Sequence, residues 1–168
     1  MSDKPTIRKN IINLSEVEVL PRPPQFAATG PAAERFDARM GFIASKTGAK
    51  KLGCNLTAVP PGKRAFPFHS HRQQEEMFFV IEGTGEVRIG KDTFPIRAGD
   101  IISCPSGGPE TAHQIVNTGR TELRYLAIST KDSPEICEYP DSGKIAALGD
   151  GLRVVLRADQ QVGYWDGE

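Results

Sequence analysis

Short apolar runs, each closed by glycine or proline, follow one another from residue 52 onward. The breaks include PPG at 60–62, GTG at 83–85 and GKD at 90–92. The 168 residues include 17 glycines and 13 prolines, where average usage would give about 20 of the two together. Such frequent breaks leave too little uninterrupted chain for a helix bundle, so they favour many short strands joined by tight turns.

Alternation within the runs indicates which side chains face a core. Leu52, Cys54, Leu56 and Ala58 alternate with small or polar residues, the period of two of a half-buried strand. We expect strands over residues 52–58, 77–81, 86–89, 93–96, 100–104, 112–116, 123–129 and 136–139. Strands this short and this regularly spaced predict an all-β fold, namely a sandwich, a jelly roll or a small barrel.

The length suits one domain with additional segments. Pro21, Pro23 and Pro24 exclude a continuing helix or a central strand near the start. We interpret residues 1–40 as an N-terminal arm, 41–140 as the strand-rich domain and 141–168 as a short C-terminal tail. Because residues 11–20 are too apolar for a free tail, the arm is expected to pack on the domain or on a partner subunit.

Residues 77–81 are apolar on both faces of the expected strand. Met77, Phe79 and Ile81 lie on one side, and Phe78 and Val80 on the other. A sheet face open to water would carry polar residues there. Either the arm or a second subunit covers this outer side, or the strand lies between two sheets of one domain. We expect the protein to be a homodimer.

Charge and composition exclude several classes of protein. Lys plus Arg and Asp plus Glu each number 21, so the formal net charge of +0 gives no reason to expect nucleic acid or an anionic membrane as a partner. The most concentrated apolar run, residues 77–81, is far too short to span a bilayer. Cys54, Cys104 and Cys137 show no paired spacing, which is typical of reduced thiols, and we expect a cytoplasmic protein.

The chain has three histidines, and two of them stand at alternate positions. His69 and His71 leave the same face of an extended chain, with Cα atoms about 6.5 to 7 Å apart, so both imidazoles could reach one ion. Glu75 or Glu76, at the start of the next apolar run, could add a carboxylate, and His113 lies in a later strand. A metal would offset the cost of burying that carboxylate. The alternative is a pair of surface histidines with no ligand role.

These residues resemble the two motifs of the cupin superfamily. His69, His71, Glu76 and Gly83 match the spacing of the first motif. The second motif is resembled by Gly99, Pro105, Gly107, His113 and Asn117. Together the two motifs span about a third of the chain. The resemblance implies that residues 41–140 form a double-stranded β-helix jelly-roll barrel holding one divalent metal on His69, His71, Glu76 and His113. It assigns Glu76 rather than Glu75 to the metal.

One departure from the second motif concerns the loop before His113. Residues 108–112 make this loop longer than is usual in the family, while the spacing from His113 to Asn117 is kept. We expect a larger turn rather than a displaced histidine. Three imidazoles and one carboxylate suit Mn, Fe, Co, Ni, Cu or Zn, whereas Ca and Mg prefer oxygen ligands, and nothing in the sequence selects among the six metals.

The resemblance extends to single-domain cupins described as sugar-phosphate isomerases. It implies a metal-dependent isomerase or epimerase acting on a small phosphorylated sugar or hydroxy-carbonyl compound. The alternatives are a metal-dependent dioxygenase and a non-catalytic cupin that binds a small molecule or a metal. Lys63, Arg64 and Arg72 could bind a phosphate and Tyr125 could offer a hydroxyl to such a ligand, or the three cations are ordinary solvated loop charges. The catalytic base is unassigned.

Overall fold

The computed structural model describes residues 10–168, so the first nine residues of the predicted arm lie outside the described residues. The described chain forms three sheets, and all their strand pairs are antiparallel. The helical elements are α1 (Ala44–Thr47) and short 3-10 turns. The predicted all-β fold is confirmed.

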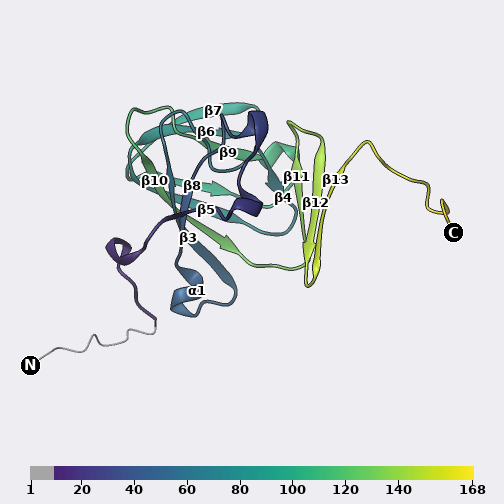
Figure 1. Ribbon diagram of the computed structural model, residues 1–168, viewed down its shortest axis with the longest axis horizontal. Coiled ribbons are helices and arrows are strands. Elements are labelled where there is room, and N and C mark those ends of the chain that lie inside the picture. The colour runs from purple at the N-terminus through teal and green to yellow at the C-terminus, as the bar shows by residue number, and fades with distance from the viewer. Residues whose placement is uncertain (1–9) are drawn as a thin grey trace, which may run out of the picture.

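The sheets can be followed in Figure 1. The largest has the order β1-β2-β3-β10-β5-β8, with β1 (Leu20–Pro21), β2 (Arg39–Phe42), β3 (Leu52–Val59), β10 (Leu123–Thr130), β5 (Glu76–Glu82) and β8 (Ile101–Cys104). A second has the order β7-β6-β9, with β7 (Asp92–Arg97), β6 (Thr84–Ile89) and β9 (His113–Val116). The third has the order β13-β12-β11-β4, with β13 (Leu152–Arg157), β12 (Lys144–Gly149), β11 (Glu135–Tyr139) and β4 (Ser70–His71).

The core lies between the largest sheet and the β7-β6-β9 sheet. Phe78, Val80 and Tyr125 from the first and Val87 and Ile115 from the second belong to one buried cluster. Their alternate positions along each strand place them on the facing sides of the two sheets. Burying side chains of this size contributes about 1.5–3 kcal/mol each, which holds the two sheets together as a jelly roll.

The described part of the arm crosses the barrel surface (Figure 1). It contains the 3-10 turns η1 (Leu14–Glu16), η2 (Pro24–Phe26) and η3 (Gly30–Ala32), and β1 extends the largest sheet beside β2. Val17 is buried against Gly41, where a Cβ atom would stand 2.4 Å from the Val17 side chain. A glycine in β2 therefore lets the arm approach closely, and the arm packs on the barrel.

The outer side of β5 remains open in this chain. Phe78 and Val80 point into the core, whereas Met77 and Phe79 are 45% and 38% exposed, and Ile101 of neighbouring β8 is 68% exposed. Within residues 10–40, the arm lies against β2 and β3 rather than against this surface. The expected cover for the apolar outer side is thus absent from the described part of one chain.

The segment 141–168 contains β12 and β13, a hairpin that pairs with β11. Sequence analysis did not predict these two strands. After Arg157 the chain leads away from the sheet (Figure 1). Among residues 10–168, no helix has both the length and the apolar character needed to cross a membrane.

Candidate metal centre

Backbone pairing brings the third histidine beside the first two. His69 and His113 exchange two backbone hydrogen bonds, His69 N to His113 O at 3.2 Å and His113 N to His69 O at 2.8 Å. His71 lies in β4, two residues further on the same face, and Glu76 is the first residue of β5. Three elements that are distant in sequence therefore meet at one end of the barrel.

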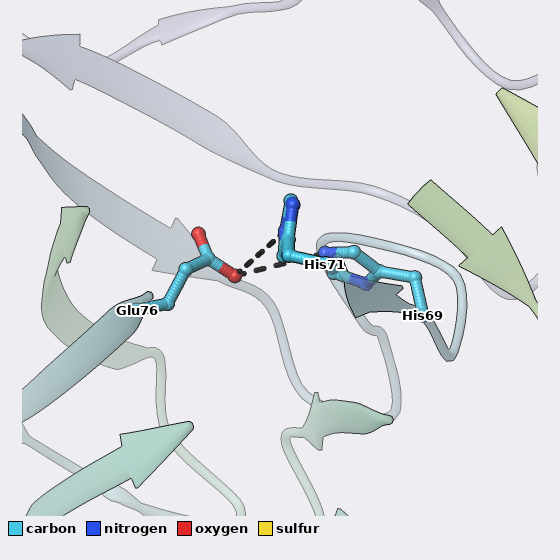
Figure 2. Close-up of side chains that lie close together, drawn as sticks. All are labelled: His69, His71 and Glu76. Atoms are coloured by element: carbon cyan, nitrogen blue, oxygen red, sulfur yellow. Dashed lines mark ion pairs between the residues drawn. The ribbon is translucent and has the colours of Figure 1, made fainter. Parts of the chain in front are cut away.

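The three imidazoles converge on one carboxylate oxygen of Glu76. Glu76 Oε2 lies 2.8 Å from His113 Nε2, 3.3 Å from His71 Nε2 and 3.7 Å from His69 Nε2. Figure 2 shows Glu76 reaching toward the imidazoles of His69 and His71. Metal bonds of about 2.0 to 2.2 Å place adjacent ligand atoms about 3 to 3.5 Å apart. The ligand atoms of His69, His71 and Glu76 lie within 4.8 Å of one another, and His113 joins this group through its contact with Glu76.

The opposite edges of two rings face backbone carbonyls. His69 Nδ1 lies 2.8 Å from Pro67 O, and His113 Nδ1 lies 3.4 Å from Thr111 O. Because a carbonyl oxygen only accepts hydrogen bonds, each Nδ1 carries the proton in these contacts. In the neutral rings, Nε2 then directs its lone pair toward Glu76. Such partners fix the tautomer and the ring orientation that a metal-binding histidine needs.

This donor set fits a divalent cation. Two neutral Nε2 lone pairs and a carboxylate oxygen repel one another unless a proton or a cation lies between them. His71 Nε2 is buried and, within residues 10–168, makes no hydrogen bond. A metal at this point would satisfy that nitrogen, and three imidazoles with one carboxylate favour a transition metal over Ca or Mg.

The pKa values of Glu76 and His71 are shifted by the neighbouring side chains of the cluster. Burial alone would raise the pKa of Glu76, but the close approach of His113, His69 and His71 outweighs it and holds the pKa well below its usual value. Burial alone would lower the pKa of His71, yet its contacts with Cys137 and Glu76 raise that pKa to about 10. Without a metal, Glu76 therefore stays ionised and His71 holds the compensating proton.

Glu135 is a residue of the site region that sequence analysis missed. Its side chain is only 2% exposed, and its carboxylate accepts backbone N–H bonds from Arg72 at 2.8 Å, Gln73 at 3.3 Å and Gln74 at 2.6 Å. These three residues form the turn between His71 and Glu76. Glu135 thus holds the turn that sets the distance between two of the clustered side chains, and no local sequence signal links it to residues 72–74.

Two further neighbours surround the histidine cluster. Cys137 Sγ lies 3.4 Å from His71 Nδ1. The Tyr139 ring stacks on His69 with centroids 6.1 Å apart, and burial raises the pKa of its phenol, which therefore stays protonated at neutral pH. Burial, with a smaller contribution from the charge of Glu76, raises the pKa of Cys104 to about 12, so this thiol is protonated at neutral pH.

The long loop before His113 forms the turn η4 (Pro109–Thr111). Ala112 is fully buried and His113 is 3% exposed, with its ring turned toward Glu76. Glu75, by contrast, is exposed at the surface and is absent from the cluster around Glu76 Oε2.

The residues considered for ligand binding lie in different places. Lys63 donates to Glu34 O of the arm at 2.6 Å, and Arg72 forms an ion pair with Glu138. Tyr125 is buried in the core against Phe78, with ring centroids 5.7 Å apart. Arg64 lines a pocket beside the arm. The structure therefore does not bring these residues together around the histidines.

A pocket of about 540 Å³ adjoins the site on the side of β10 and β3. Its lining includes Asn55, Gln74 and Ser129, and Ser129 pairs directly with Glu76 across β10 and β5. Amide and hydroxyl groups of this kind can hydrogen-bond a polar small molecule.

Comparison with known proteins now identifies the domain. A family model described as "Cupin domain" matches residues 55–129. The chain contains a cupin domain. The match covers most of the strands that build the barrel, including β5, β9 and β10, and it confirms the resemblance seen in the two sequence motifs.

The cupin domain is also similar to curated proteins over part of their length. It is 34% identical over 82 residues to an uncharacterized protein of Methanocaldococcus jannaschii, covering 49% of this chain and 55% of that one. It is 34% identical over 70 residues to an oxalate-binding protein of Thermotoga maritima, covering 42% of this chain and 54% of that one. The chain spans about half the length of these curated relatives.

Solved structures share the fold over nearly the whole chain. A cupin-superfamily sugar phosphate isomerase of Silicibacter pomeroyi superposes with a TM-score of 0.78 at 22% identity, covering 93% of this chain and 98% of that one. A protein of Acidithiobacillus ferrooxidans superposes with the same TM-score and identity, covering 93% and 97%. The predicted jelly-roll cupin fold is thereby confirmed.

Proposed function

We propose that this cupin domain binds one divalent transition metal through His69, His71, Glu76 and His113. The observation that carries the proposal is the convergence of three imidazole Nε2 atoms on Glu76 Oε2, at 2.8 to 3.7 Å. The fixed Nδ1 contacts of His69 and His113 and the unpartnered Nε2 of His71 within the described residues support it. The donor set suits Mn, Fe, Co, Ni, Cu or Zn.

Two adjacent glutamates provide a test of this assignment. Glu76→Gln should lower metal affinity by at least about tenfold, because it replaces an anionic ligand at the centre of the cluster with a neutral amide. Glu75→Gln removes the same charge from the neighbouring surface position and should leave affinity unchanged. Titration of chelator-treated protein with Zn²⁺ and Mn²⁺ measures both. Equal affinity in the two variants contradicts the role given to Glu76.

We further propose that the metal-bound domain is an isomerase acting on a small phosphorylated sugar or hydroxy-carbonyl compound. The similarity in fold to the Silicibacter pomeroyi protein over 93% of the chain supports this choice. When bound, a divalent metal would polarise a carbonyl or lower the pKa of a hydroxyl placed beside it. Glu76, His69, His71 and His113 would hold that ion, and Ser129 and Asn55 in the adjoining pocket would orient polar groups of the ligand.

Proton transfer in such a reaction needs a group other than Glu76. Glu76 Oε2 faces three imidazoles, and in the proposed site this carboxylate is a metal ligand. The Tyr139 phenol stacks on His69 and stays protonated, so it can donate a proton or a hydrogen bond at the edge of the site. Tyr139 is therefore a candidate general acid, and the base that accepts the carbon-bound proton is unassigned.

Turnover by metal-loaded protein tests the isomerase proposal. We expect conversion within a panel of aldose and ketose phosphates, with exchange of the proton next to the carbonyl visible by NMR in D₂O. Chelator and Glu76→Gln should each abolish the exchange, whereas Glu75→Gln should retain it. Stoichiometric metal without turnover of any compound in the panel would refute the isomerase and leave the metal site standing.

Binding without catalysis is the second candidate function. The relative from Thermotoga maritima, 34% identical over 70 residues, is described as an oxalate-binding protein. A small carboxylate that binds the metal-loaded domain with no chemical change would favour this role.

We also propose that the cytoplasmic protein is a homodimer joined through the open outer side of β5. Met77, Phe79 and Ile101 expose apolar side chains there, and Leu126 and Ile128 of β10 lie beside them. A contiguous apolar surface of this kind is typical of a protein–protein contact.

A charge placed on this surface should separate the subunits. Phe79→Asp would bury a charge in the interface, so light scattering after gel filtration should show a shift from dimer to monomer. Phe94→Asp, which alters an exposed phenylalanine on β7, is the matched control and should stay dimeric. A monomeric wild-type protein would refute the dimer.

A further inference from the structure

A second pocket, of about 370 Å³, lies between the arm, residues 64–68 and the turn 141–144. Four basic side chains line it: Arg22 and Arg35 from the arm, Arg64 from the segment before β4, and Lys144 at the start of β12. Figure 1 shows the later part of the arm lying near the sheet that contains β11, β12 and β13. Folding thus collects four cations that are widely separated in the sequence.

Acidic side chains do not contact these cations directly in the described structure, although the charge of Asp37 lies near Arg22. Within residues 10–168, none of the four side chains forms an ion pair. Asp141, the acid that lines the pocket, accepts from Arg88 at 2.9 and 3.0 Å through its two oxygens. The buried Arg64 Nε also has no hydrogen-bond partner in this part of the chain. Four like charges around one cavity repel one another unless an anion enters.

Aromatic rings link the pocket to the histidine cluster. His69 lies between Phe66, at 6.3 Å between ring centroids, and Tyr139, at 6.1 Å. The Arg22 guanidinium stands 4.4 Å from the Phe66 ring, and Lys144 Nζ stands 5.4 Å from the Tyr139 ring. Each of these two cations is therefore separated from His69 by a single ring. The pocket itself opens on the other face of these segments, because its lining residues Phe68 and Gln114 alternate with His69 and His113.

We propose that this basic pocket binds the phosphoryl group of a small phosphate monoester. Guanidinium groups of Arg22, Arg35 and Arg64 offer paired N–H donors that match phosphate oxygens, and Lys144 adds a point charge. A dianion compensates several cations better than a single carboxylate does. That the monoester is also the substrate rests on the proposed function, whereas anion binding by the pocket does not require a metal.

Calorimetry on chelator-treated protein at constant ionic strength tests the pocket by itself. Inorganic phosphate and glycerol 3-phosphate should each bind with 1:1 stoichiometry, and acetate and glycerol should bind at least tenfold more weakly. Lys144→Gln and Arg64→Gln should each weaken phosphate binding at least tenfold. Lys91→Gln, which removes an exposed cation from the β6–β7 turn, should leave it unchanged. Thermal unfolding of each variant confirms that the compared proteins are folded.

The outcomes separate this inference from the proposed function. Glu76→Gln should still bind phosphate while losing metal and turnover. If the protein binds phosphate but isomerises no compound in the panel, the phosphate-binding pocket is supported and the isomerase proposal is refuted. The inference is overturned if the wild-type protein shows no saturable phosphate binding. It is also overturned if folded Lys144→Gln and Lys91→Gln bind phosphate with equal affinity. Equal affinity for acetate and phosphate overturns the assignment to a phosphoryl group.

Discussion

Replacing both His71 and His113 with alanine should abolish stoichiometric metal binding. The two imidazoles reach Glu76 Oε2 from different strands, at 3.3 and 2.8 Å, so their loss leaves one histidine and one carboxylate. Loss of a single outer-sphere partner typically lowers metal affinity about 10- to 100-fold, and two direct ligands should lower it by more than about a thousandfold. Elemental analysis of untagged, metal-loaded protein measures the change.

Ser70→Ala is the matched control for this double variant. Ser70 lies between His69 and His71, is 1% exposed, and its hydroxyl has no hydrogen-bond partner within residues 10–168. We expect one metal per chain in Ser70→Ala and a β-type circular dichroism spectrum in both variants. Full metal content in the folded double variant would end the assignment of these ligands.

Glu135→Ala should lower the free energy of unfolding by about 3–5 kcal/mol. The change removes the acceptor of three backbone N–H groups, and each group left unsatisfied costs about 1–3 kcal/mol, less where water can reach the turn. The turn at residues 72–74 would also lose its anchor, so the separation of His71 and Glu76 would vary. Chemical denaturation measures the stability, and metal titration of the folded protein should show weaker binding.

Glu138 of the same strand provides the comparison for Glu135. It pairs with Arg72, whose side chain is 48% exposed, so Glu138→Ala should cost at most about 1 kcal/mol. Glu135→Gln, which keeps one carbonyl oxygen to accept hydrogen bonds, should fall between the two alanine variants. Equal destabilisation by Glu135→Ala and Glu138→Ala would mean that the three backbone bonds do not anchor the turn.

Local sequence patterns predicted most of the barrel strands, although β2 and β4 were not among them. Leu52 to Ala58 alternate within β3, and the turn residues around 83–85 and 90–92 separate β5, β6 and β7 as expected. The spacing of His69 and His71 placed both rings on one side of the chain for the same reason, since period two is a property of the extended backbone. Close approach of His113 was implied by the cupin resemblance rather than by spacing.

Contacts between distant segments could not be predicted in this way. Glu135 holds residues 72–74 only because β11 pairs with β4, and β4 itself is two residues long. The residues of β12 and β13 alternate weakly, and their pairing with β11 depends on tertiary contacts. Of the three cations singled out in the sequence, Arg64 lines the basic pocket, while Lys63 and Arg72 are held by the arm and by Glu138.

The arm supplies two of the four cations of the proposed basic pocket and none of the proposed metal ligands. Arg22 and Arg35 belong to residues 10–40, whereas the four proposed metal ligands lie between residues 69 and 113. Val17 seated over Gly41 keeps the arm in place without any contribution from the histidines. If the pocket and the metal site act as proposed, a different arm on an unaltered barrel should change the anion preference and leave metal binding unchanged.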